Sequence, residues 1–108
     1  MTDYTAKAKE LIANNKYLML SKTWCPDCQY AYSIFDKFGV KGKVHIIELD
    51  KFEDQTEADN LQSGFTEIVG RKWVPSIFFN GEVFDESDLK KMAASEELEQ
   101  FFRKHGII

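Results

Sequence analysis

The chain has 108 residues, of which 44% are hydrophobic and 30% are charged, and its formal net charge is -4. This length suits one domain, spanning 1–108, that can bury an ordinary core. The acidic balance argues against a general binder of nucleic acid or of anionic membranes. No signal-peptide pattern and no apolar run of membrane length is present, so we expect a cytoplasmic protein without nucleic-acid or membrane partners.

The first third of the chain predicts a helix, a strand and a second helix. The helix over 3–15 carries three apolar residues on one face, namely Ala8, Leu11 and Ile12. The nearly continuous apolar run Tyr17–Ser21 is typical of a buried strand. Pro26 suits the first position of the next helix, and Gly39 suits its end. The apolar stripe of that helix is Ala31, Ile34, Phe35 and Phe38.

The remainder predicts a strand, a helix, a hairpin and two further helices. The strand covers Val44–Leu49, and the helix covers about 55–69 and stops at Gly70. The inward residues of that helix are Ala58, Leu61, Phe65 and Ile68. Asn80-Gly81 between two apolar runs, Ser76–Phe79 and Glu82–Phe84, is a strong hairpin signal. The serines that suit the N-caps of the last two helices are Ser87 and Ser95.

The element order is therefore α-β-α-β-α-β-β-α-α. The first two strands flank a crossover helix, so they should be parallel, whereas the hairpin strands should be antiparallel. We expect an α/β fold in which helices cover both faces of a four-stranded mixed sheet.

The only two cysteines, Cys25 and Cys28, stand three positions apart in Trp24-Cys25-Pro26-Asp27-Cys28. Outside an oxidising compartment, such a pair indicates redox chemistry or metal binding. Cys25 falls at a helix N-terminus, where free N–H groups favour a thiolate, so we assign it as the nucleophile. Cys28, one turn into the helix, is the resolving thiol. The charge of Asp27 should oppose the Cys25 thiolate.

Two other interpretations of the pair are a metal corner and a purely structural thiol pair. A tetrahedral metal site needs two more ligands, and the only histidines, His45 and His105, are isolated in the sequence. We therefore expect no metal and favour redox chemistry.

The sequence resembles the glutaredoxin family, a branch of the thioredoxin superfamily, over nearly its whole length. Lys22 with Cys25-Pro26-Asp27-Cys28 is similar to the family signature, in which Tyr usually stands between Pro and the second Cys. Three further segments match family motifs, namely Trp73–Gly81, Gln62 (thirteen residues before Pro75) and Ser87-Asp88-Leu89. The resemblance implies a thioredoxin-like fold of the glutaredoxin type.

The resemblance also implies a glutathione-disulfide oxidoreductase that uses glutathione as cosubstrate. Backbone groups at Val74 and Pro75, across a cis peptide, would pair with the cysteine of glutathione. Its glycine carboxylate would face three residues, Lys22, Gln62 and Lys72. Its γ-glutamyl end would face Ser87 and Asp88. We expect a monomer whose other partners are disulfide-containing or glutathionylated proteins.

Three departures from the family pattern predict altered or poor glutathione handling. Asp27 replaces the usual Tyr, and Trp73 replaces the usual Thr before Val-Pro. Phe84-Asp85-Glu86 stands where Gly-Gly normally lets glutathione approach, and its two acids should disfavour an anionic ligand.

Two other functions remain open. Trp-Cys-Pro-Asp-Cys also resembles a thioredoxin-related family, so the protein could be a dithiol reductase that depends on an NADPH-driven reductase. An iron–sulfur carrier would use Cys25 from two protomers and two glutathiones, although Pro26 should hinder it. Trp24 is either a docking surface for partners or a packed cover of the active-site loop.

Overall fold

The computed structural model describes residues 3–108, which form seven α- or 3-10 helices and four strands. The elements follow the predicted order, with two short 3-10 turns (η1 and η2) in addition. Their bounds are α1 Tyr4–Asn14, β1 Tyr17–Ser21, α2 Pro26–Lys37, η1 Lys41–Lys43, β2 His45–Glu48, η2 Leu49–Lys51, α3 Gln55–Val69, β3 Ser76–Phe79, β4 Glu82–Phe84, α4 Glu86–Ala94 and α5 Leu98–Lys104.

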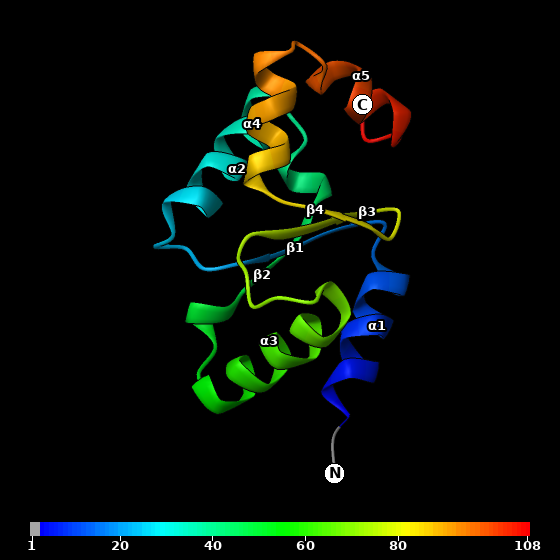
Figure 1. The fold of residues 1–108 in the computed structure, drawn as a ribbon. Helices are drawn as coiled ribbons and strands as arrows, with labels where there is room; N and C mark the ends of the chain where they lie inside the picture. Colours follow the sequence, from blue (N-terminus) through cyan, green and yellow to red (C-terminus); the bar gives the residue numbers. More distant parts are fainter. Residues whose placement is uncertain (1–2) are drawn as a thin grey trace.

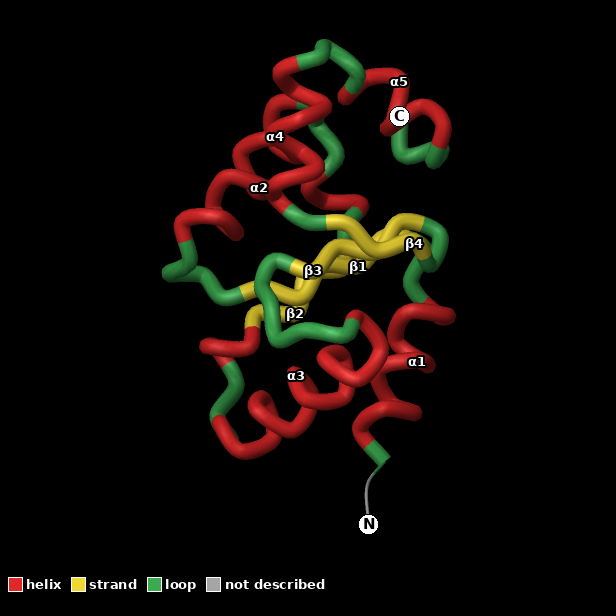
Figure 2. The backbone as a smooth tube through the Cα atoms, viewed as in Figure 1, coloured by secondary structure: helices red, strands yellow, loops and turns green. Residues whose placement is uncertain are grey.

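The four strands form one mixed sheet in the order β2-β1-β3-β4. β1 is parallel to β2 and antiparallel to β3, and β3 is antiparallel to β4, as predicted. Helices α2 and α4 cover one face of the sheet, α1 and α3 cover the other, and α5 lies at the end of the α2 and α4 layer (Figures 1 and 2). The predicted α/β architecture, with helices on both faces, is therefore confirmed.

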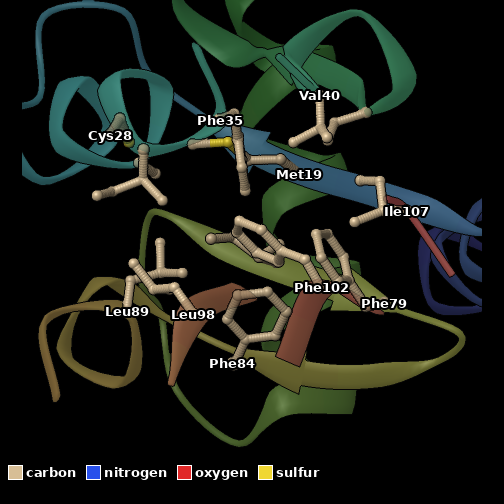
Figure 3. Close-up of a cluster of buried hydrophobic side chains, with 14 of the residues drawn as sticks. Met19, Cys28, Phe35, Val40, Phe79, Phe84, Leu89, Leu98, Phe102 and Ile107 are labelled. Carbon is tan, nitrogen blue, oxygen red and sulfur yellow. The ribbon is translucent and has the colours of Figure 1, made fainter. Parts of the chain in front are cut away.

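Alternating strand residues divide the core into two clusters. Met19, Ile77 and Phe79 face α2, α4 and α5, whereas Leu18 and Phe78 face α1 and α3. The first cluster also contains both cysteines, and Figure 3 shows Cys28 among its apolar side chains. The two cysteine side chains are thus part of the main core.

Turn residues behave as predicted at two places. Asn80 and Gly81 have φ of 54° and 83°, which is the positive-φ pair of a tight hairpin turn. Gly70 ends α3 in the left-handed conformation, at φ 89°.

The two predicted serine caps are wrong. α4 is capped by Asp85, which leaves Ser87 inside its first turn. Ser95 ends α4 as its C-cap, and Glu97 precedes α5. An Asp carboxylate is as effective an N-cap as a Ser hydroxyl. Asp88, three residues after Asp85, completes a capping box.

Across residues 3–108, every helix falls short of the length and apolar character that crossing a membrane requires.

Candidate active site

The loop after β1 places Cys25 at the start of α2. The N–H of Cys25 donates to the Lys22 carbonyl at 3.1 Å, and the Cys25 carbonyl accepts from the N–H of Gln29 at 2.9 Å. Thr23 is fixed in turn by Asp50, which accepts its N–H at 2.9 Å and its hydroxyl. These bonds to Thr23 hold the pKa of Asp50 below its ordinary value. Hydrogen bonds at Lys22, Thr23 and Cys25 therefore fix the loop that carries Cys25.

Cys25 is the N-cap residue of α2, and Pro26 takes a position in the first turn. Its extended backbone leads into the helix, yet within residues 3–108 the Cys25 side chain makes no capping hydrogen bond. The helix start therefore keeps N–H groups that a thiolate or a ligand anion can use.

The two thiols differ in their surroundings. Cys25 keeps 9% of its surface exposed, whereas Cys28 is fully buried. Burial is the main reason that the pKa of Cys28 rises to about 11, and the Lys22 backbone and the Ser21 hydroxyl partly oppose the rise. The inner thiol is therefore the less exposed of the two.

Asp27 forms an ion pair across to α4. Its Oδ1 lies 3.6 Å from Nζ of Lys90, and both side chains are about half exposed. Lys90 therefore offsets part of the negative charge that Asp27 brings beside Cys25, although a pair this exposed is weak. The predicted effect of Asp27 on the thiolate stays a prediction.

The Val74–Pro75 peptide bond is cis. Pro75 is buried, and Val74 is half-buried and packs against the core cluster that contains both cysteines. The segment expected to pair with the cysteine of glutathione thus packs on the core cluster to which Cys25 and Cys28 belong.

The three residues expected at the glycine carboxylate come from three different segments of the chain. Lys22 is half-buried, and its Nζ lies 5.8 Å from the centre of the Trp24 ring. Lys72 is exposed in the loop before Val74. Gln62 lies on α3 and is 96% buried. In the described part of the chain, no hydrogen bond or ion pair joins them, so their joint role stays a prediction.

The start of α4 is occupied by its own carboxylate. Oδ1 of Asp85 accepts the N–H groups of Ser87 at 3.0 Å and of Asp88 at 3.2 Å. The Asp88 carboxylate accepts the N–H of Asp85 at 3.0 Å, which completes the capping box. Both residues expected to hold the γ-glutamyl end of glutathione are therefore already engaged.

Three further side chains close over this helix start. Arg71 pairs with Asp85, and its guanidinium lies 4.4 Å from the Trp73 ring centre. The Trp73 indole N–H donates to Glu86 at 3.1 Å, and Glu86 is 95% buried. We call Arg71, Trp73, Asp85 and Glu86 the α4 clasp. Two of the departures noted in the sequence, Trp73 and Asp85-Glu86, thus bind one another.

Trp24 is 64% exposed next to Cys25. Of its two interpretations, the exposed side chain fits a docking surface and not a packed cover.

Comparison with known proteins agrees with this geometry. The sequence model of the glutaredoxin family matches residues 17–84. Glutaredoxin-8 of Saccharomyces cerevisiae is 34% identical over 109 residues, covering 100% of this chain and 99% of the relative. The chain belongs to the glutaredoxin family.

Solved glutaredoxins share the whole architecture. The solution structure of yeast dithiol glutaredoxin Grx8 superposes with a TM-score of 0.84 at 34% identity, covering 100% of this chain and 99% of that one. A buckwheat glutaredoxin–glutathione complex superposes with a TM-score of 0.80 at 24% identity, covering 97% and 92%. The second likeness shows the common fold alone.

Glutaredoxins are thiol oxidoreductases, and the assignment of that chemistry to Cys25 and Cys28 in this member stays a prediction. Residues 3–108 contain no group of three or more His, Cys, Asp or Glu side chains arranged to hold a metal ion.

Sequence reasoning missed two sets of residues around the motif. The first is the α4 clasp, in which Arg71 pairs with Asp85 and lies over the Trp73 ring. The other is the hydrogen-bonded group near Cys28, namely Ser21, Tyr32 and Glu48, of which Ser21 is fully buried. The Asp85/Asp88 spacing is a signal that could have revealed the cap, whereas the hydrogen-bonded group depends on strand register.

Proposed function

We propose that this glutaredoxin reduces disulfides and glutathione mixed disulfides with Cys25 as nucleophile, Cys28 as resolving thiol and glutathione as electron donor. The observation that carries the proposal is the placement of Cys25. Its thiol stands at the uncapped start of α2, at the edge of the core, with a second thiol buried one turn below.

The Cys25 thiolate attacks one sulfur of the substrate disulfide, and a Cys25 mixed disulfide forms while the other sulfur leaves as a thiolate. Cys28 then attacks Sγ of Cys25 and releases the second thiolate, which leaves a Cys25–Cys28 disulfide. Two glutathione molecules return this disulfide to the dithiol and are themselves oxidised to glutathione disulfide. A second glutathione can instead attack the mixed disulfide directly, which bypasses Cys28.

The α4 clasp limits the affinity for glutathione in this proposal. A γ-glutamyl carboxylate that seeks the N–H groups of Ser87 and Asp88 must compete with the Asp85 carboxylate that they already hold. We expect a high KM for glutathione together with intact thiol chemistry.

The occupied start of α4 also supports a second candidate function. A thioredoxin-like dithiol reductase has no need for an open glutathione site, and the exposed Trp24 beside Cys25 offers an aromatic contact for a protein partner. Such an enzyme would take electrons from an NADPH-dependent reductase.

The choice of electron donor tests the proposal. Reduction of a small mixed disulfide is measured with glutathione and glutathione reductase, and separately with thioredoxin reductase, each with a Cys25→Ser control. Turnover that depends on glutathione and on Cys25 supports the proposal. Turnover with thioredoxin reductase alone would replace it with the second candidate.

A further inference from the structure

A chain of hydroxyl groups runs beneath the resolving thiol. The Ser21 hydroxyl is completely buried and hydrogen-bonds to the Tyr32 hydroxyl. The Tyr32 hydroxyl donates to Oε2 of Glu48 at 3.3 Å. Glu48 is half-buried at the edge of the sheet, so the chain leads from the core toward solvent.

Strand register and helix periodicity assemble this group. Ser21 and Glu48 are direct partners in the parallel pairing of β1 with β2, so their side chains share one face of the sheet. Ser21 lies two residues after Met19, which faces α2. Tyr32 stands one turn after Cys28 on α2, and positions i and i+4 lie on the same side of a helix. One helix face thus carries Cys28 and Tyr32 over one strand pair.

Cys28 must lose its proton before it can attack the Cys25 mixed disulfide. The thiol is fully buried, and its pKa is raised to about 11, so its thiolate is scarce near neutral pH. Water has little access to collect the proton. The Ser21 hydroxyl opposes part of this rise, since it is near enough to the Cys28 thiol to lower its pKa.

The Tyr32 hydroxyl is suited to transfer a proton from one neighbour to the next without becoming charged itself. Burial is the main reason that the pKa of Tyr32 rises to about 12, so the phenol stays neutral. A neutral hydroxyl can accept one hydrogen bond and donate another at the same time.

We infer that Ser21 and Tyr32 carry the Cys28 proton to the Glu48 carboxylate when Cys28 resolves the mixed disulfide. The inference rests on the dithiol chemistry of the proposed function. It assigns Ser21, which touches the reacting thiol, a catalytic role. Tyr32 and Glu48 act through Ser21.

The step balances without any further reactant. In this inference the Cys28 thiol donates to Ser21, Ser21 donates to Tyr32, and Tyr32 donates to Glu48. The structure allows this order because either hydroxyl of the Ser21–Tyr32 pair can be the donor. Each proton then moves one place along, so Glu48 becomes a neutral acid and Cys28 a thiolate that receives a hydrogen bond from Ser21. The thiolate bonds to Sγ of Cys25, the bond from Cys25 to the outer sulfur breaks, and that sulfur leaves as a thiolate. Glu48 then releases its proton to solvent.

The charged and titratable groups near this chain of hydroxyls come from five elements. α2 supplies Cys28 and Tyr32, and η1 supplies Lys41, whose Nζ lies 4.8 Å from the Tyr32 ring centre. Lys7 of α1 and His45 of β2 line the same surface hollow as Glu48. Asp50, in η2, is engaged by Thr23.

Rapid mixing of the reduced protein with dithio-bis-nitrobenzoate tests the inference. The first thionitrobenzoate is released when Cys25 attacks, at a rate proportional to the reagent concentration. The second is released when Cys28 attacks the Cys25 mixed disulfide, at a rate independent of that concentration. A Cys28→Ser protein releases only the first. The two phases separate the proposed function from the proton path.

The variants are Tyr32→Phe and Glu48→Gln, with Tyr30→Phe and Glu53→Gln as matched controls elsewhere on α2 and after η2. We expect both test variants to slow the second phase about tenfold or more at neutral pH and to leave the first unchanged. The double variant should be no slower than the single ones. The wild-type second phase should be nearly flat from neutral to mildly alkaline pH, whereas the variants should accelerate steadily as pH rises. The pH profiles differ because, without the proton path, the variants can react only through Cys28 that has already lost its proton.

A second phase in Tyr32→Phe and Glu48→Gln that keeps the wild-type rate and pH profile would overturn the inference. So would a loss of rate with an unchanged pH profile, since it would mark a structural role. Absence of the first phase in the wild-type protein would instead overturn the proposed function. Circular dichroism of each variant establishes that the compared proteins are folded.

Discussion

The starts of α2 and α4 lie side by side in one layer of the molecule and differ in how their N–H groups are used. α2 begins at Cys25, whose side chain makes no capping bond within the described chain, with Pro26 next to it. α4 begins at Asp85, whose carboxylate takes two N–H groups and whose own N–H is taken by Asp88. The Asp27–Lys90 pair joins the two helices.

The difference shows how one domain separates reactivity from ligand affinity. A helix that leaves its first N–H groups open can stabilise a thiolate, at some cost in stability. A helix that caps itself is more stable, but it no longer offers those groups to an anion. In the function proposed here, the first arrangement serves the thiol chemistry of Cys25, and the second stands where the γ-glutamyl end of glutathione is expected.

Replacing the thiols should have the largest effect on activity. Cys25→Ser should lower turnover by a factor of about a thousand or more, because a serine hydroxyl at neutral pH is a far weaker nucleophile. Cys28→Ser should retain activity toward glutathione mixed disulfides if a second glutathione resolves the intermediate. A glutathione-coupled disulfide assay measures both, and full activity of Cys25→Ser would refute its assignment as nucleophile.

Alkaline pH should destabilise the reduced protein through Cys28. Its folded pKa of about 11 lies above the ordinary value of 9.0, so the folded state favours the thiol form. This stability is fully present below pH 9 and is lost as pH rises through 11, by about 3 kcal/mol. Urea unfolding of reduced wild type and Cys28→Ala across this range measures it. An equal decline in both proteins would show that Cys28 is not the cause.

Capping predicts opposite changes in stability at the two helix starts. Asp85→Ala should lower the free energy of unfolding by about 1 kcal/mol, and Asp54→Ala, at the similar cap of α3, should do the same. Cys25→Ser should raise it by about 0.5 kcal/mol, because serine supplies the missing cap. Urea unfolding of the reduced proteins checks both signs. A loss of stability in Cys25→Ser would mean that the start of α2 is not open.

Local patterns in the sequence were sufficient to predict the order of the elements and the fold class. The apolar stripe from Ala31 to Phe38, the run Tyr17–Ser21 and the Asn80-Gly81 turn each depend on near neighbours, and the structure confirms all three. Ser87 and Ser95 were misassigned because several residues near each helix start can cap it. Which residue caps α4 depends on the direction in which the backbone leaves the β3–β4 hairpin.

The site could be predicted only in part, for a similar reason. Cys25 and Cys28 follow from three-residue spacing, which helix geometry turns directly into proximity. The α4 clasp requires Arg71 and Trp73 to meet a helix that begins more than ten residues later. The group beneath Cys28 requires the pairing of Ser21 with Glu48, which no local pattern reveals.

The glutathione KM of Asp85→Asn tests the contrast between the two helix starts most directly. Asparagine keeps a capping oxygen but removes the charge, and it frees Arg71 to attract a carboxylate. With Asp54→Asn as the control cap, we expect the KM for glutathione to fall about fivefold in Asp85→Asn alone, with little change in kcat. An unchanged KM, or an equal fall in Asp54→Asn, would contradict the account that the α4 start is closed to glutathione by its own carboxylate.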